Sequence, residues 1–263
     1  FMGYQTTTAK MNAIFADLSK DNLIYGPKRF VGDGTFTHVD TIRYGQITNL
    51  SEIEFAEKSN YSFKEVLLPI SETLFYFTEN EMKEADAPPK GAIVFLRSCD
   101  LHGLKRMDTI YLENGAVDTY YKRLRDNTKF ILMGCENSFE NCFCVSMGTQ
   151  QSDDYDAYLK VDGDAVLVDS HWDALDTALA GASQTPVIPD SVIANDTVVT
   201  IPETVPQTLF DDPFWTDYGN RCIACGRCNF VCPTCTCFTM QDVFYTDNGK
   251  AGERRRVWAS CHV

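Results

Sequence analysis

The sequence contains no apolar run long enough to cross a membrane. None of its hydrophobic stretches approaches the roughly 20 residues that a transmembrane helix needs. The N-terminal stretch FMGYQTTTAKMNAIF has no cationic start followed by a long apolar segment, so it does not match a secretory signal. We therefore expect a cytoplasmic protein without a membrane span.

Basic residues and motifs for organic catalysis are also scarce. The 263 residues include 23 Lys and Arg against 37 Asp and Glu, a formal net charge of -14. Nucleic acid is therefore not an expected partner, because phosphate binding needs a basic surface. We find no G-x-G-x-x-G, no P-loop and no Ser/His/Asp signature. Any redox chemistry would have to come from bound groups and from partner proteins.

Cysteine, by contrast, is abundant, with eleven residues in the chain. A chain of 263 residues with 44% hydrophobic residues can build an ordinary core and does not need the disulfide scaffold of a small secreted protein. Cytosolic thiols stay reduced, so clustered cysteines there more often bind metal or carry out redox chemistry.

Six of the cysteines fall within RCIACGRCNFVCPTCTCF, residues 221–238. The spacing C-x2-C-x2-C-x3-C, followed by Pro233, is that of bacterial 4Fe-4S ferredoxins, in which successive thiolates reach different irons of a cubane. Gly226 relieves crowding between backbone and cluster, and Pro233 ends the segment. The sequence therefore predicts an iron–sulfur cluster on Cys222, Cys225, Cys228 and Cys232.

A zinc site is the main alternative for this run. Zinc ribbons usually show two C-x2-C pairs separated by a longer gap, which is not the pattern here. A purely structural face of cysteines would leave dense free thiols open to oxidation. Three further cysteines could complete or line the cluster, and the sequence leaves open whether each is a ligand or a bystander: Cys235, Cys237 and Cys261. His262 is expected to be a bystander.

The other four cysteines lie in LRSCDLHGL and MGCENSFENCFCVSMG. Cys99 and Cys135 each follow an apolar run typical of a buried strand, and ligands of α/β sheets gather at the carboxyl ends of strands. Cys142 and Cys144 lie together on one loop. These four thiols predict a second cluster site, and the alternative is that they are small buried hydrophobes. His102 could point at the same place, although a capping role is commoner.

The hydrophobic pattern predicts an α/β (α+β) domain over residues 1–185. Strands are expected within residues 26–47, 73–78, 88–100 and 129–136 and in a hairpin over 157–170, and helices over 8–21, 101–112, 118–127 and 170–182. Five prolines punctuate residues 186–213, which we expect to be an irregular connector. Residues 214–263 are predicted to form a small ferredoxin-like 4Fe-4S module.

Four blocks, in this order, resemble a known family: RSCDLHGLKRMD, GCENSFENCFCVSMGT, RCIACGRCNFVCPTCTCF and WASCHV. They resemble the iron–sulfur electron-transfer subunit of the anaerobic sulfite reductase, and they are similar to the beta subunit of sulfhydrogenases. The resemblance covers roughly residues 90–263 and supports ligation of 4Fe-4S clusters by the two sets of four cysteines, giving two clusters in this chain.

The resemblance also implies partners. The chain would be a non-catalytic member of a hetero-oligomeric, NADH-dependent dissimilatory sulfite reductase. It would pass electrons from a flavin- and NADH-binding subunit to a sirohaem subunit that reduces sulfite to sulfide under anaerobic conditions. The alternative is the electron-transfer beta subunit of a sulfhydrogenase-type NiFe hydrogenase. The family pattern continues past the W-x-S-C segment to a second C-x2-C-x2-C run. Either a longer form holds a third cluster, in which case Cys232 would serve it and a downstream cysteine would complete the Cys222 site, or this member lacks that cluster. The resemblance therefore leaves the fourth ligand of the Cys222 site open.

Two groups of basic residues have open roles. Arg221 and Arg227 flank the first thiolates of the run and would either tune a cluster or pair with surface acids. The segment GERRRVW, residues 252–258, would either dock an acidic partner or form a solvated face. Two other classes of protein also remain open. One is an enzyme with an open-coordinated cluster at the first cysteine set, and the other is a zinc-dependent interaction module.

Overall fold

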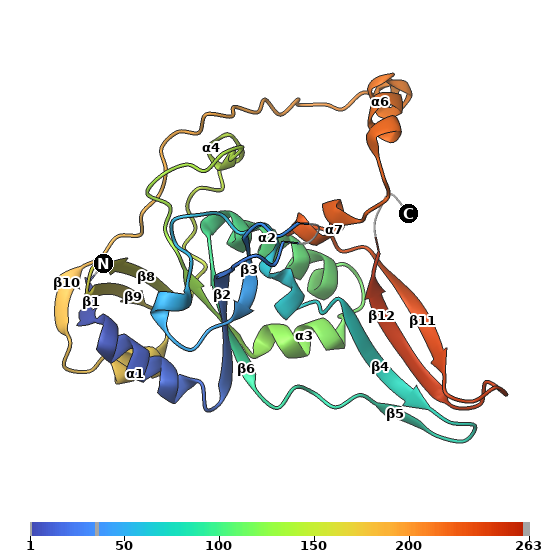
Figure 1. Ribbon diagram of the computed structural model, residues 1–263, viewed down its shortest axis with the longest axis horizontal. Coiled ribbons are helices and arrows are strands. Elements are labelled where there is room, and N and C mark those ends of the chain that lie inside the picture. The colour runs from blue at the N-terminus through green and yellow to red at the C-terminus, as the bar shows by residue number, and fades with distance from the viewer. Residues whose placement is uncertain (1, 35–36, 260–263) are drawn as a thin grey trace.

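The computed structural model describes residues 2–34 and 37–259, and its body is an α/β unit around an eight-stranded sheet (Figure 1). Strands β2, β6, β7 and β8 form a parallel group at the centre of the sheet. All pairs that involve the other strands are antiparallel. In spatial order the strands are β10 (Ser183–Pro186), β1 (Met2–Thr7), β9 (Ala165–Ser170), β8 (Ala157–Asp162), β7 (Thr128–Leu132), β6 (Gly91–Leu96), β2 (Asn22–Phe30) and β3 (Thr41–Gln46).

Helices cover both faces of this sheet. Side chains of a strand alternate between faces, and in β6 both Ile93 and Phe95 on one face and Val94 and Leu96 on the other are fully buried. The first face packs against α1 (Thr8–Leu18) and α5 (Asp173–Ala178). The second packs against α2 (Ser98–Asp108), α3 (Thr119–Asp126) and the short helix η2 (Phe63–Val66). The predicted α/β class is therefore confirmed.

The predicted strands, the hairpin over residues 157–170 and most of the helices are present. The helices are shorter than predicted, whereas β2 and β4 begin before the expected positions, at Asn22 and Ser71. The helix expected over residues 101–112 is the exception, because α2 begins earlier, at Ser98. The Asp100 carboxylate accepts a hydrogen bond from the backbone N–H of Arg97 at 3.1 Å and satisfies the free end of the helix. Cys99 therefore lies in the first turn of a helix. The last predicted turn is a π-helix, η3 (Thr109–Glu113).

A second sheet is four-stranded and antiparallel throughout, in the order β11 (Phe238–Phe244), β12 (Gly252–Trp258), β4 (Ser71–Phe77) and β5 (Met82–Glu84). Its two halves come from distant parts of the sequence. The hairpin that follows the cysteine-rich segment therefore shares a sheet with strands from the first part of the chain, as the red and cyan strands in Figure 1 show.

Residues 187–206 contain no helix or strand, as expected for the connector. Figure 1 shows this segment as an extended chain that passes α4 (Cys144–Met147) and leads to α6 (Phe214–Arg221), which stands away from the body. The remaining short elements are η1 (Leu50–Glu52), η4 (Gln207–Asp211) and α7 (Arg227–Val231). Within the described ranges no helix is long and apolar enough to cross a bilayer.

Arg256 links the second sheet to the body through ion pairs. Its side chain is only 2% exposed, and it pairs with Glu72 at 2.7 Å and with Asp118 at 2.6 Å. Glu72 lies directly opposite Arg256 in the pairing of β12 with β4, and Asp118 precedes α3. Burial acts to lower the pKa of Arg256, but the charges of Asp118 and Glu72 outweigh it and raise that pKa.

Each arginine of the basic run over residues 252–258 pairs with an acidic residue of the same chain, and of the three only Arg256 is buried. Arg254 pairs with Asp242 across the hairpin at 2.7 Å, and Arg255 pairs with Glu253. Together with the buried Arg256, these pairs place an acidic partner for each arginine of the run within the chain itself. Arg254 and Arg255 lie at the surface, as a solvated face predicts, whereas the buried Arg256 departs from it; docking of an acidic partner stays a prediction.

Replacing Arg256 should loosen the hairpin from the body. The change Arg256→Met leaves two carboxylates near a buried position without their cation, which should lower the free energy of unfolding by about 3 kcal/mol. The matched control is Arg254→Met in the same strand, which removes an exposed pair and should leave stability nearly unchanged. Denaturant unfolding followed by circular dichroism measures both, and equal stability of the two variants would contradict this role.

Candidate metal centres

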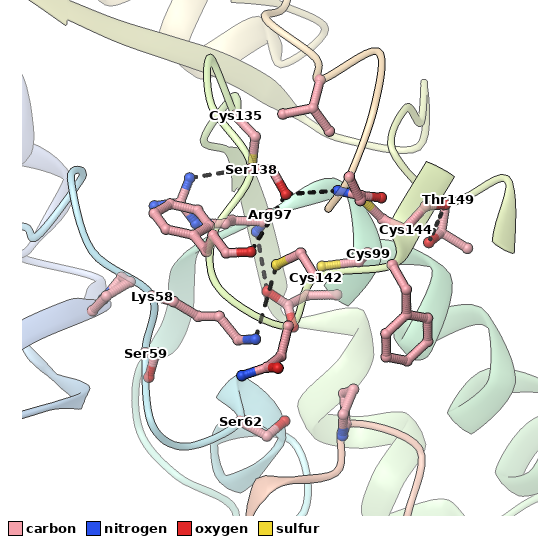
Figure 2. Close-up of a pocket in the computed structure, with 18 of the residues that line it drawn as sticks. Lys58, Ser59, Ser62, Arg97, Cys99, Cys135, Ser138, Cys142, Cys144 and Thr149 are labelled. Atoms are coloured by element: carbon pink, nitrogen blue, oxygen red, sulfur yellow. Dashed lines mark hydrogen bonds between the residues drawn. The ribbon is translucent and has the colours of Figure 1, made fainter. Parts of the chain in front are cut away.

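Cys99, Cys135, Cys142 and Cys144 line one cavity of about 330 Å³, which we call the cysteine cavity (Figure 2). Cys99 follows β6 and Cys135 follows β7. Because β6 and β7 are adjacent and parallel, the turns at their carboxyl ends meet at one edge of the sheet. The structure thus brings these four thiols around one space. Their role as cluster ligands stays a prediction.

Backbone geometry presents the two loop cysteines to the cavity. Asn141 adopts a left-handed conformation with φ of 62°, and the N–H of Cys142 donates to the carbonyl of Phe139 at 3.1 Å. This tight turn precedes Cys142. Cys144 then begins α4, which ends at Gly148 with φ of 65°. A short helix ending at a left-handed glycine keeps the loop compact.

Cationic and amide side chains contact the thiols of the cysteine cavity. Arg97 is buried, and its guanidinium donates to Cys135 Sγ at 3.3 Å and to the Gly134 carbonyl at 2.9 Å. Lys58 Nζ lies 3.9 Å from Cys142 Sγ, as Figure 2 shows. Asn195, from the connector, has its amide group 3.6 Å from Cys144 Sγ. Sequence reasoning missed these three residues, although Arg97 stands only two positions before Cys99.

The electrostatics of the cavity disfavour thiolates that lack a cation. Burial raises the pKa of Cys99 well above its usual value, and the negative charges of Asp100 and of the other three cysteines add to this. Burial also raises the pKa of Cys135, while the nearby Arg97 opposes the shift. Coordination to a metal deprotonates a thiol outright. Cys99 and Cys135, which resist ionisation alone, fit a site completed by positive metal.

The C-terminal cysteines occupy a loop, α7 and the turn after it; we call residues 222–237 the cysteine run. Cys222 ends α6, and Ala224 and Gly226 take left-handed conformations with φ of 54° and 69°. These two residues make the loop tight enough to step from Cys222 to Cys225 and into α7, which carries Cys228. Cys222, Cys225, Cys228 and Cys237 are exposed, and Cys232 and Cys235 are partly buried.

The cysteine run and the cysteine cavity share a wall. Val231 and Pro233 from the run line the cavity that holds the first four cysteines. Gly103 on α2 permits this contact, because a Cβ at that position would lie 3.1 Å from the Cβ of Pro233. The helix that carries Cys99 is thus packed directly against the proline that follows Cys232.

A buried lysine lies beneath the cysteine run. Lys64 of η2 has a relative exposure of 0%, and its ammonium donates to the carbonyl of Asn229 and, at 3.1 Å, to that of Cys235. Burial lowers the pKa of Lys64, and negative charge on Cys235, Cys232 and Cys237 opposes this shift. No sequence pattern marks this residue, because SFKEV reads as an ordinary amphipathic turn.

Other residues named from the sequence have ordinary roles. His102 is 2.8 Å from the carbonyl of Gln151 through Nε2 and so is a satisfied helix histidine. Arg221 pairs with Asp217 at 3.0 Å, and Arg227 lies over the ring of Tyr61 at 5.5 Å. The surface pairing expected for both arginines therefore holds for Arg221, while Arg227 contacts an aromatic ring. Cys261 and His262 lie outside the described residues.

Both candidate donor sets are built from cysteine. Among residues 2–34 and 37–259, no group of three His, Cys, Asp or Glu side chains is arranged to hold one metal ion. The ten cysteines of the described ranges are all free thiols. A 4Fe-4S cluster takes cysteine thiolates as its protein ligands. Cysteine-only donor sets with left-handed residues between them fit that group.

Comparison with known proteins agrees with this chemistry. Residues 221–263 match the model of a 4Fe-4S dicluster domain. The chain is similar to sulfhydrogenase 2 subunit beta of Pyrococcus furiosus, with 26% identity over 266 residues that cover 95% of this chain and 76% of the relative. No solved structure matches the chain. The predicted iron–sulfur character of the C-terminal region and the predicted similarity to sulfhydrogenase beta subunits are both confirmed.

Iron content should separate the two cysteine sets. Protein purified without oxygen should contain about eight irons and matching acid-labile sulfide, as expected for two 4Fe-4S groups. Cys135→Ser and Cys228→Ser should each remove about half of the iron, because each removes one thiolate from a different set. Ser191→Ala, outside both sets, is the control. Zinc without sulfide would contradict the assignment. Full iron in Cys135→Ser would show that the cavity thiols are structural.

Proposed function

We propose that this chain is the iron–sulfur electron-transfer subunit of a hetero-oligomeric oxidoreductase. The observation that carries the proposal is the wall shared by the cysteine cavity and the cysteine run. Electron relays need redox groups held close together in fixed positions. Contact of Val231 and Pro233 with the cavity of the four body cysteines supports two such groups side by side.

The chain's own residues would hold and tune these groups. Cys99, Cys135, Cys142 and Cys144 would ligate one 4Fe-4S cluster, and Cys222, Cys225, Cys228 and Cys232 another, with Cys235 and Cys237 as further candidates within the described residues. Each cluster, when bound, would supply one-electron redox chemistry. Hydrogen bonds and charge at the sulfurs set the potential of such a group. Arg97 and Lys58 are placed to do this at Cys135 and Cys142.

The reaction itself would belong to partner proteins. One candidate complex reduces sulfite to sulfide. It takes electrons from a flavin- and NADH-binding component and delivers them to a sirohaem component. It is favoured by the order and content of the four cysteine-bearing sequence blocks. The other is a sulfhydrogenase-type NiFe hydrogenase, and the similarity to sulfhydrogenase 2 subunit beta favours it. In both, the chain would carry electrons without binding the substrate.

Packing of Pro233 on α2 should control the magnetic coupling between the two clusters. Gly103→Val adds a branched side chain where even a Cβ lies 3.1 Å from Pro233, and should push the cysteine run away from the cavity. In dithionite-reduced protein, EPR should then show weaker coupling between the two S = 1/2 signals, with unchanged iron. Gly219→Val is the control, since a Cβ there meets nothing within 4 Å. Unchanged coupling in Gly103→Val would argue against the shared wall as the path through which the two clusters are coupled.

Isolation of the native complex should identify the partners. We expect the chain to co-purify anaerobically with redox subunits. The complex should show either NADH-dependent sulfite reduction or hydrogen-dependent dye reduction, and these two activities separate the candidates. Cys135→Ser should abolish electron delivery through the complex while leaving NADH or hydrogen oxidation with an artificial acceptor at the donor subunit unchanged. A chain that purifies alone and reduces sulfite by itself would contradict the relay proposal and favour an enzyme with an open-coordinated cluster.

A further inference from the structure

Within the described ranges, Lys64 is a charged group buried without a carboxylate partner. Its relative exposure is 0%, and among the ion pairs of residues 2–34 and 37–259 none involves Lys64. Arg256, which is also deeply buried, has two carboxylates. Burial of an ammonium is strongly unfavourable unless it is hydrogen-bonded and balanced by negative charge. Lys64 therefore needs a source of negative charge that the side chains around it do not provide as an ion pair.

The neighbours of Lys64 satisfy its N–H groups and leave its charge unbalanced. The ammonium donates to the backbone carbonyls of Asn229 and Cys235, with the side-chain oxygen of Asn229 at 3.5 Å. It also lies 4.4 Å from the centre of the Trp258 ring, a cation–π distance. The carbonyl and amide partners of Lys64 are dipoles, and the Trp258 ring acts through its quadrupole. They orient Lys64 and hold it under the cysteine run, but none carries a full negative charge.

The groups in position to balance this charge are the thiols of the cysteine run, which become thiolates when they bind metal. Lys64 donates to the Cys235 carbonyl at 3.1 Å, so negative charge on Cys232, Cys235 and Cys237 would act on its ammonium. A cluster bound by such thiolates carries net negative charge, which grows by one unit when the cluster accepts one electron. No bond breaks in that step, and the electron comes from the donor subunit or, in a titration, from dithionite. A fixed cation nearby stabilises the reduced form more than the oxidised form.

We propose that Lys64 is the buried counter-charge of the redox group held by the cysteine run and that it raises the reduction potential of that group. This inference rests on the proposed function, since it needs a cluster in the run. It assigns the tuning role to a residue of the body, about 160 positions before the run in the sequence. Arg221, by contrast, is exposed and already paired with Asp217.

The burial of Lys64 makes this effect stronger than that of a surface charge. Exposed charges are screened by water and salt, whereas charges held in the protein interior are screened much less. Lys64 also bonds the backbone on both sides of Cys232, at Asn229 and Cys235. Its position relative to the thiolates is therefore fixed by the same contacts that bury it.

Two variants separate charge from hydrogen bonding. Lys64→Gln removes the charge but keeps an amide donor for the carbonyls, and Lys64→Met removes both charge and donor. If the charge sets the potential, both should shift the reduction equilibrium of one cluster at least tenfold toward the oxidised form. This corresponds to about 59 mV for a one-electron couple. EPR-monitored redox titration of the full chain measures the shift, with Lys122→Gln, an exposed lysine of α3, as the control.

The possible outcomes test this inference and the proposed electron-transfer function separately. Native iron and sulfide in Lys64→Gln, together with a lower potential for one cluster only, would support it. A native potential in Lys64→Gln with a changed potential in Lys64→Met would reduce Lys64 to a hydrogen-bonding role and overturn the proposal. Full iron and unchanged potentials in both variants would overturn it as well. Wild-type protein without iron or sulfide would instead remove the proposed function itself.

Discussion

The ion pair between Arg256 and its two carboxylates is the contact on which the arrangement of the molecule depends. It joins β12 to β4 and to the start of α3, so the hairpin that follows the cysteine run is fixed to the body. Trp258, at the end of β12, donates to the Leu68 carbonyl and packs on Phe230 of α7 at 5.3 Å. The second half of the cysteine run is thereby held between this hairpin and the wall of the cavity, which Val231 and Pro233 line.

In a chain with a net charge of -14, three cations nevertheless lie beside the thiols. Arg97 and Lys58 contact the cavity sulfurs, and Lys64 lies beneath the run. Lys58 and Lys64 come from segments outside the cysteine motifs, while Arg97 lies two positions before Cys99 in LRSCDLHGL. The motifs therefore supply the thiol ligands, while the α/β body supplies positive charge that offsets the repulsion between closely spaced thiolates.

The sequence predicted what depends on local spacing. The α/β body, the adjacent strands before Cys99 and Cys135, and the ferredoxin-type run all follow from periodicity or from short motifs. Asp100 could also have indicated the early start of α2, because an acidic residue three positions after Arg97 is a helix-start signal. The burial of Lys64 and Arg256 could not be predicted, since each depends on a partner segment more than 100 positions away. In GERRRVW, composition alone suggests a solvated surface.

The long sequence separation within the second sheet has a consequence for synthesis on the ribosome. Glu72 and Arg256 are 184 positions apart, and β4 emerges long before the strand that covers it. Until β12 arrives, one side of β4 is an unpaired edge that can recruit other strands. The same delay keeps the cysteine run unanchored until its following hairpin is made. The second sheet is therefore completed late in synthesis, and the cysteine run becomes anchored at the same stage.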